Sequence, residues 1–234
     1  MNILSGFARW RVKLAWLLAG GVFLIIVCLT YLQLFSDREI ALVMGEPWDK
    51  MRWRSTAPIA QALPGYRWGA SPETDARLRF VDEQYGFITP VGRFFIVTFD
   101  NEKVVSAIIH PHTKPLLIDD ALAIVLDLQN QWRRGGWYLV YPNDEPPIED
   151  TPEWRFRLRN VNKGGRVFWQ AADKYQAMLI MHRFNDVRHP DQERYQVILD
   201  VSGVWMPSEA EQANIKLKPY LCKKPCTKEI MESF

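Results

Sequence analysis

Cysteine and histidine are scarce in this chain of 234 residues. It has three cysteines, Cys28, Cys222 and Cys226, and four histidines. Cys28 lies within a long apolar run, and no histidine stands near the other two cysteines to complete the four ligands of a structural zinc site. Three residues separate Cys222 from Cys226, whereas the redox motif C-x-x-C has two. Zinc binding and thioredoxin-type chemistry are therefore both disfavoured.

Catalytic signatures are also missing. The chain contains no G-x-S-x-G, G-x-x-x-x-G-K-[ST], H-E-x-x-H or G-x-G-x-x-G sequence. His110 and His112 flank one proline and could place two imidazoles together, and His182 and His189 could join them after folding. No acidic or cysteine partner stands at a diagnostic spacing, however, and a strand end followed by a turn explains the same residues. We predict no metal site, no cofactor and no catalytic residue.

An excess of positive charge is lacking as well. Of the 29 Lys and Arg, three precede residue 14, so that 26 remain against 27 Asp and Glu, a net charge of about −1. Nucleic-acid binding requires clustered excess cation. Nucleic acid is therefore not an expected partner.

The feature that is present is an uncharged run of 19 residues, 14–32, behind Arg9, Arg11 and Lys13. As a helix it would be roughly 28 Å long, close to the ~30 Å of a bilayer core. The basic flank, residues 1–13, is expected to stay in the cytoplasm, which sends the rest of the chain across the membrane.

Three alternatives to an uncleaved anchor fit this segment less well. A cleaved signal peptide has a shorter apolar core and a small-x-small cleavage site, which residues 31–35 do not offer. A lipoprotein would be acylated at Cys28, but Val27 precedes it and the cysteine lies deep in the run. A buried soluble helix of this length would have a polar face. We therefore predict a single transmembrane helix at residues 14–35.

Cys222 and Cys226 lie in a basic tail, residues 206–234. A disulfide, a redox pair and two unpaired thiols all remain open for them. An exported location permits disulfides, so we predict a bond between these two cysteines. It would stiffen the tail without holding the domain together.

Between anchor and tail, the pattern predicts a connector rich in Pro and Trp at residues 36–75 and one α+β domain at residues 76–205. An antiparallel, or mixed, sheet covered by helices is expected. Residues 93–99 predict a central strand buried on both faces, and residues 103–109 the strand that returns. Residues 174–184 fit either a strand or a helix.

Two helices have terminal signals. Asp119 and Asp120 open the first, which has a broad apolar surface, a narrow solvent stripe that includes Gln131, and a stop at Gly135 and Gly136. Thr151 and Pro152 open a second, short helix that runs to about residue 159.

A loop rich in Pro and acid, residues 142–151, separates the two helices. A loop of this composition is ordinarily exposed to solvent. Catalysis by two of its carboxylates would need burial to separate their pKa values. Stiff prolines also lower the cost of presenting charge to a protein partner. The aromatic and arginine residues on either side are of the types that dominate binding hot spots, although packing in the core also explains tryptophans, as we expect for Trp132 and Trp169. The candidate partner-binding residues are Arg133, Arg134, Trp137, Tyr138, Asp144, Glu145, Glu149, Asp150 and Trp154.

Residues 92–99, 119–132 and 171–184, together with the layout of one anchor and one domain, resemble membrane-tethered periplasmic immunity proteins that accompany type VI secretion effectors, particularly lipase-class toxins. The resemblance contains no diagnostic motif and transfers no catalytic or binding residue. It implies a single-pass protein of the bacterial inner membrane, with its N-terminus in the cytoplasm and its domain in the periplasm. The implied partner is a secreted toxin.

Two further hypotheses remain open on the sequence alone. An assembly or adaptor subunit of an envelope secretion complex would have a stoichiometric membrane partner and would depend on its own anchor. An envelope enzyme with dispersed site residues would act on lipid, glycan or peptide substrates.

Overall fold

The computed structural model describes residues 38–161, 163–186, 189–190 and 192–205, together with Gly21 and Leu24. The predicted anchor, apart from those two positions, and the tail with Cys222 and Cys226 lie outside the described residues. None of the helices within the described part of the chain is long and apolar enough to cross a membrane. The described domain belongs to one compact unit that begins at Arg38.

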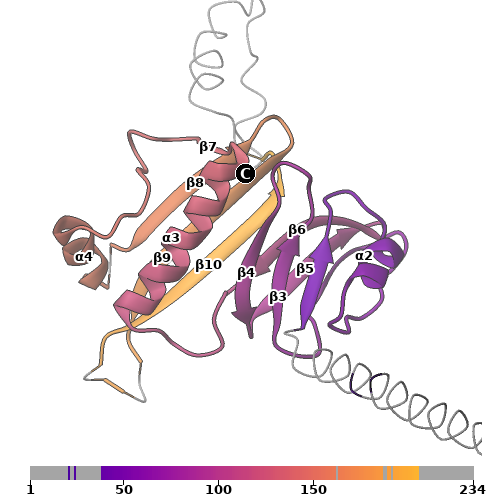
Figure 1. Cartoon of the computed structure of the whole chain (residues 1–234), viewed down its shortest axis with the longest axis horizontal. Helices are drawn as coiled ribbons and strands as arrows, with labels where there is room; N and C mark the ends of the chain where they lie inside the picture. The colour runs from indigo at the N-terminus through magenta and orange to yellow at the C-terminus, as the bar shows by residue number, and fades with distance from the viewer. Residues whose placement is uncertain are drawn as a thin grey trace, which may run out of the picture. The chain divides into compact units, whose positions relative to one another are not determined.

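The described residues form an α+β domain of ten strands and three helices (Figure 1). Its elements are β1 (Glu39–Leu42), α2 (Trp48–Arg54), β2 (Arg67–Ala70), β3 (Ala76–Phe80), β4 (Phe87–Gly92), β5 (Phe95–Asp100), β6 (Lys103–Ile109), α3 (Ile118–Gly135), β7 (Tyr138–Leu139), α4 (Pro152–Arg159), β8 (Gly165–Ala171), β9 (Tyr175–Phe184) and β10 (Arg194–Gly203).

Two sheets make up the domain. The larger has seven strands in the order β2-β5-β6-β10-β9-β8-β7, and all its neighbours are antiparallel. The smaller has the order β1-β3-β4, in which β1 and β3 run parallel and β3 and β4 antiparallel. The predicted α+β class is confirmed, but the domain has two sheets instead of one: the larger is antiparallel and the smaller is mixed.

The segment predicted as a connector, residues 36–75, contributes to both sheets. β1 pairs with β3, β2 pairs with β5, and α2 packs beside β1. Within this segment Met51 is fully buried in the same core as the later strands. The fold therefore begins at Arg38.

The predicted hairpin at residues 93–109 is confirmed as β5 and β6, but β5 is not buried on both faces. Phe95, Val97 and Phe99 face the core, whereas Ile96 and Thr98 on the other side are half-buried. Aromatic and β-branched residues fill both faces of β5 although only one is fully buried. For this reason a continuous apolar run did not reveal the difference.

The main helix is also confirmed. Asp119 and Asp120 lie in the first turn of α3, and its C-terminus ends at Gly136, which has a φ of 83°. The N–H of Trp137 donates to the carbonyl oxygen of Trp132 at 3.0 Å, which closes the last turn as a glycine stop requires. The segment that fitted both helix and strand, residues 174–184, forms β9, which hydrogen-bonds to β8 and β10 along its length.

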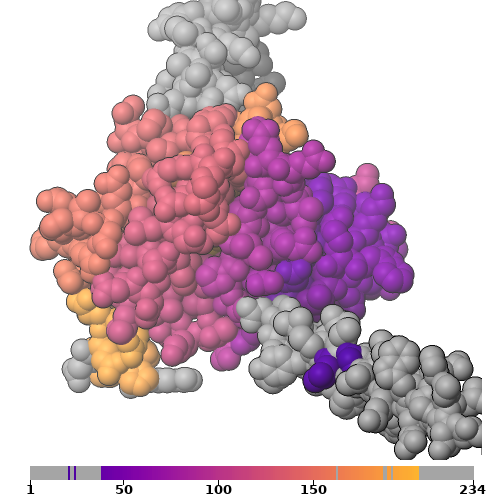
Figure 2. Space-filling view, viewed as in Figure 1, coloured from indigo at the N-terminus to yellow at the C-terminus, as the bar shows by residue number. Residues whose placement is uncertain are grey.

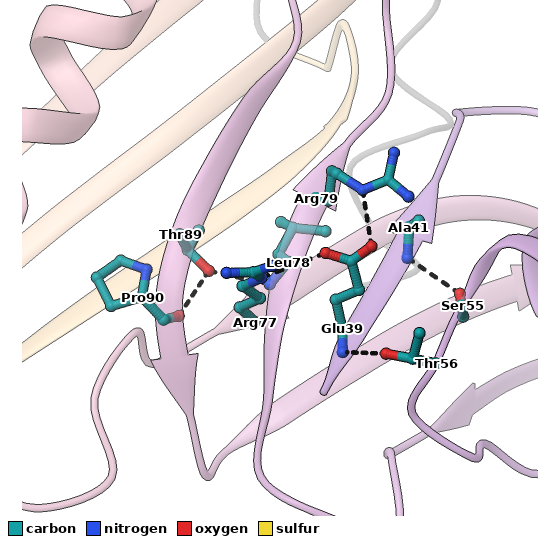
Figure 3. A network of polar contacts seen from close by, with 9 residues as sticks. All are labelled: Glu39, Ala41, Ser55, Thr56, Arg77, Leu78, Arg79, Thr89 and Pro90. Atoms are coloured by element: carbon teal, nitrogen blue, oxygen red, sulfur yellow. Dashed lines mark hydrogen bonds and ion pairs between the residues drawn. The ribbon is translucent and has the colours of Figure 1, made fainter. Parts of the chain in front are cut away.

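Both outer edges of the small sheet are closed by side chains. At β1 the N–H groups of Glu39 and Ala41 donate to the hydroxyls of Thr56 (2.9 Å) and Ser55 (3.0 Å), as Figure 3 shows. At β4 the side-chain amide of Gln131 binds both the N–H and the carbonyl of Ile88, each at 2.9 Å. Gln131 therefore leaves the predicted solvent stripe and joins α3 to the sheet.

The same network fixes the centre of the small sheet (Figure 3). The carboxylate of Glu39 accepts from Nε of Arg77 (3.2 Å) and Nε of Arg79 (2.9 Å) on the neighbouring strand. The register shifts between these two arginines, and Thr89 fills the irregularity by accepting the N–H of Leu78 at 3.0 Å. One strand-end acid thus holds the two strands together from the solvent side.

One continuous core lies between two layers. In Figure 1, α3 runs across β8, β9 and β10, and the small sheet lies over β5 and β6. Seven rings meet beneath the C-terminal half of α3 with centroids 4.9–6.4 Å apart; they belong to Phe80, Tyr85, Phe87, Trp132, Trp137, Trp169 and Tyr175. The predictions that Trp132 and Trp169 are core residues are confirmed.

Candidate protein-binding surface

The predicted partner-binding residues do not form one patch. Arg133 and Arg134 lie in the last turn of α3. Asp150 lies near the first turn, because Arg155 binds both Asp150 and Asp119. Fourteen helical residues separate Asp119 from Arg133, a distance of about 21 Å along the axis. The set therefore divides into a group at each end of α3.

Trp137 is not a surface residue. Its side chain is 4% exposed, its indole N–H donates to the carbonyl oxygen of Tyr85 at 3.2 Å, and its ring lies 5.8 Å from that of Trp132. The chain folds back after the stop at Gly136 and places this ring under α3. Trp137 stabilises the core and is not accessible to a partner in this conformation.

At the C-terminal end of α3, Arg133 lies 5.4 Å above the ring of Trp169 and donates to Oδ1 of Asn130 at 2.9 Å. Arg134 and Tyr138 are exposed. Within the loop, Asp144 and Glu149 are exposed, whereas Glu145 accepts from Nε of Arg166 at 2.9 Å. This bond raises the pKa of Arg166.

The acidic loop is attached to α3 by one buried residue. The side chain of Gln129 donates to the carbonyl oxygen of Ile148 at 2.7 Å and accepts the Ile148 N–H at 3.2 Å. Ile148 is fully buried and lies against Gly165, where a Cβ would approach its Cδ1 to 2.9 Å and Cζ3 of Trp154 to 3.0 Å. A glycine at residue 165 therefore allows the loop and α4 to pack on β8.

The start of α4 is fixed as its sequence predicts. The hydroxyl of Thr151 accepts the N–H of Trp154 at 3.2 Å, and Pro152 occupies the first turn. The guanidinium of Arg155 donates to Asp150 at 3.0 Å and to Asp119 at 2.7 Å. Hydrogen bonding to Asp150, and then to Asp119, raises the pKa of Arg155, and the same contact lowers the pKa of Asp150. An ionic bridge thus joins α4 to the first turn of α3.

α4 exposes one aromatic ring next to cationic side chains. Phe156 is 79% exposed, and the guanidinium of Arg157 lies 4.9 Å above the ring of Trp154. Arg157 also donates to the carbonyl oxygen of Gly164 at 2.9 Å, which fixes its position. We call Phe156, Arg157 and the two half-buried residues before them, Trp154 and Arg155, the α4 surface; α4 lies at the left margin of the face in Figure 2.

Of this surface, sequence reasoning selected Trp154 and missed Phe156. The alternation Trp154, Arg155, Phe156, Arg157 offers one signal, because an eight-residue helix buries few positions and Leu158 is the one that is fully buried. An aromatic residue two positions before a buried leucine falls on the opposite side of a helix.

The structure brings three of the four histidines near one another. His110 and His112 have ring centroids 5.8 Å apart, and His182 is close enough to His110 to interact electrostatically. Burial lowers the pKa of all three, and His112 accepts the N–H of Val197. Within the described part of the chain no three His, Cys, Asp or Glu side chains are arranged to hold a metal ion.

No family model, no curated protein and no solved structure matches this chain.

Proposed function

We propose that this protein is a membrane-anchored immunity protein that binds and neutralises a secreted toxin of the lipase class in the bacterial periplasm. In this proposal residues 14–35 form a single helix in the inner membrane, residues 1–13 stay in the cytoplasm, and the domain lies in the periplasm. The uncharged run with its basic flank supports the topology. The resemblance given above supports the role.

The observation that carries the binding role is the α4 surface. It presents an aromatic ring that is 79% exposed beside arginines, in an element of only eight residues. Aromatic and arginine residues dominate the energetics of interfaces.

The α4 surface is also rigid for so short an element. The cap at Thr151, the bridge from Arg155 to Asp119 and the buried pair of Gln129 and Ile148 fix it at three points. A surface that is ordered before binding loses less conformational entropy when a partner docks. A tether to the membrane then confines this surface to the layer where an envelope toxin acts, which raises its effective concentration.

Growth protection tests the proposal. Each secreted protein encoded beside the gene for this chain is directed to the periplasm of a host bacterium, with and without this chain, and survival is counted. An immunity protein rescues growth against one of them, and it still does so when residues 1–35 are exchanged for a foreign single-pass anchor. Rescue that disappears on anchor exchange would indicate an assembly subunit, and no rescue against any of them would overturn the proposal.

A matched pair of variants then tests the surface. Phe156→Ala is expected to weaken binding of the rescued toxin by about 2 kcal/mol, roughly 30-fold in Kd. Trp53→Ala removes an aromatic ring that is 90% exposed on α2 and is expected to leave Kd unchanged. Equal effects of the two variants, measured by titration calorimetry, would remove the α4 surface from the interface.

A further inference from the structure

The edges of the two sheets are protected unequally. At the small sheet, side chains occupy backbone groups of both outer strands, β1 and β4. The seven-stranded sheet ends on one side at β7, which has two residues, and on the other at β2, whose one neighbour among the described strands is β5. β2 contains no proline and no lysine, and its pairing with β5 has no register shift that would twist the edge away. An edge strand without these devices is open to pairing with another strand.

The register shows which backbone groups of β2 point outward. The N–H of Asn101 donates to the carbonyl oxygen of Tyr66 at 3.1 Å, and hydrogen-bonded positions alternate along an antiparallel pair of strands. Trp68, two residues further on, therefore directs its N–H and carbonyl groups toward β5. Arg67 and Gly69 direct theirs away from the sheet. We call the outward N–H and carbonyl groups of these two residues the β2 edge.

The β2 edge is exposed, and the turn before it is fixed. Residues 63–69 are all exposed, and none of the isolated bridges between described residues involves β2. The N–H of Gly65 donates to Oδ1 of Asn101 at 3.0 Å, which ties the start of β2 to the end of β5. An edge that is ordered before it pairs loses less conformational entropy on association.

The side chains of β2 alternate between the two faces of the sheet. Trp68 lies opposite Phe99 on the core side, yet its side chain is 44% exposed. Arg67 and Gly69 lie on the other side, where a Cβ at residue 69 would approach Cγ2 of Ile96 to 3.3 Å. A glycine within a strand often marks a place where another backbone approaches closely. β2 thus offers a bare backbone position between an exposed indole ring and one cation.

We propose that two copies of this chain associate through the β2 edge, as antiparallel strands related by a two-fold axis at Trp68. In this register Arg67 of each copy forms a hydrogen-bonded pair with Gly69 of the other, so that every outward group finds a partner. The inference does not depend on the proposed function.

The side chains of β2 favour a second copy as the occupant. Two-fold symmetry exchanges the two outward positions, so the arginine of one copy always lies beside the glycine of the other. The glycine leaves room for the long stem of Arg67, and the two guanidinium groups are not placed directly opposite each other. The two Trp68 rings lie opposite each other across the axis and form an aromatic cross-strand pair, which removes exposed ring surface from water.

Disulfide trapping tests the register in the full chain in detergent, with Cys28, Cys222 and Cys226 replaced by serine. Trp68→Cys places two thiols directly across the axis, with Cα atoms about 4.5 Å apart, a separation that a disulfide spans. Arg67→Cys places them two positions apart along the strands, roughly 8 Å between Cα atoms, which is too far. Under mild oxidation we expect Trp68→Cys to form a covalent dimer at least about tenfold faster than Arg67→Cys.

Trp53→Cys is the matched control for random collision, because Trp53 is a tryptophan of α2 that is 90% exposed and lies outside β2. Dimer formation that is faster at residue 68 than at residues 67 and 53 supports the proposal. Equal rates at the three positions, a faster rate at residue 67, or no dimer at residue 68 would overturn it.

Self-association of the chain with its own cysteines, kept reduced, gives a second readout that leaves Trp68 in place. Arg67→Pro removes one outward N–H from each copy and no hydrogen bond to β5, at the first residue of an edge strand, where proline is tolerated. Light scattering in detergent over a range of concentrations is expected to show association at least about tenfold weaker than in the parent chain. Arg67→Ala keeps the N–H, and we expect it to change association less than about threefold. A parent chain that stays monomeric, or equal effects of the two variants, would contradict the proposal.

Discussion

Gln129 binds the backbone of Ile148 through both ends of its side-chain amide, at 2.7 Å and 3.2 Å. Two residues further along α3, Gln131 binds both backbone groups of Ile88 in the same way. One turn of α3 therefore sets the position of the acidic loop and of β4. Each glutamine provides the hydrogen bonds that a neighbouring strand would otherwise give. No repeating pattern in the sequence predicts either pair of residues.

Replacing Gln129 with alanine is expected to destabilise the domain. The change leaves the N–H and carbonyl of Ile148 unpaired and buried, which costs about 1–3 kcal/mol. Thermal unfolding followed by tryptophan fluorescence measures the loss. Asn130→Ala, at an exposed position next to it, serves as the control and is expected to change stability by less than about 0.5 kcal/mol. Equal melting temperatures for the two variants would show that the buried pair does not stabilise the loop.

Gly165→Ala is expected to cost about 1–3 kcal/mol, because the added methyl group overpacks against Ile148 and Trp154. The displacement of Ile148 and Trp154 should also loosen α4, so that limited proteolysis cuts within residues 142–159 sooner than in the parent chain. At Gly203 the nearest atom to an added methyl group is the Lys174 carbonyl oxygen at 3.9 Å. Gly203→Ala is thus the matched control and should melt as the parent does.

Trp137 and Tyr138 are neighbours that should respond in opposite ways. Trp137→Ala removes a ring from the aromatic core and is expected to cost about 3–5 kcal/mol. Tyr138 is 44% exposed, and Tyr138→Ala is expected to cost under about 1 kcal/mol. Melting temperatures of the two variants decide the matter. A surface-like response of Trp137→Ala would place its ring outside the core.

Stability at alkaline pH should depend on Tyr195. Burial, and then the charge of Glu193, raises the pKa of its hydroxyl from 10.0 to about 12. The folded state holds the hydroxyl proton of Tyr195 more tightly than the unfolded state does. Its contribution to the free energy of unfolding is therefore complete below the unfolded pKa and is lost as pH rises from 10 toward 12. The loss approaches about 1.4 kcal/mol per pH unit at most.

Tyr195→Phe should flatten this dependence. Between about pH 9 and pH 12, the melting temperature of the parent should fall more steeply than that of the variant. Lysine titration affects both chains alike and cancels in the comparison. Parallel curves would show that the hydroxyl of Tyr195 does not titrate differently in the folded and unfolded states.

Local chemistry in the sequence predicted the elements whose ends it determines. The stop at Gly136, the cap at Thr151 and the hairpin around Asn101 depend on residues within a few positions of each other, and all three are confirmed. The anchor, the disulfide between Cys222 and Cys226 and the toxin partner stay predictions.

Contacts between distant segments were not readable in the same way. The parallel pairing of β1 with β3 joins residues 38 positions apart, and it draws the predicted connector into the fold. Trp137 is among the predicted partner-binding residues because it follows two arginines, yet a chain reversal places it in the core. Phe156 shows the converse, since the sequence pattern does not single it out and its ring is 79% exposed.

The closed margins of the small sheet restrict how another polypeptide can associate with it. Thr56 and Ser55 occupy the N–H groups of Glu39 and Ala41 on β1, and Gln131 occupies the N–H and the carbonyl of Ile88 on β4, so an incoming strand cannot pair with these groups. Strand addition is the step by which sheets recruit further chains into fibrils. At Glu39, Ala41 and Ile88, another chain therefore meets groups that are already paired, and strand addition at these positions is disfavoured.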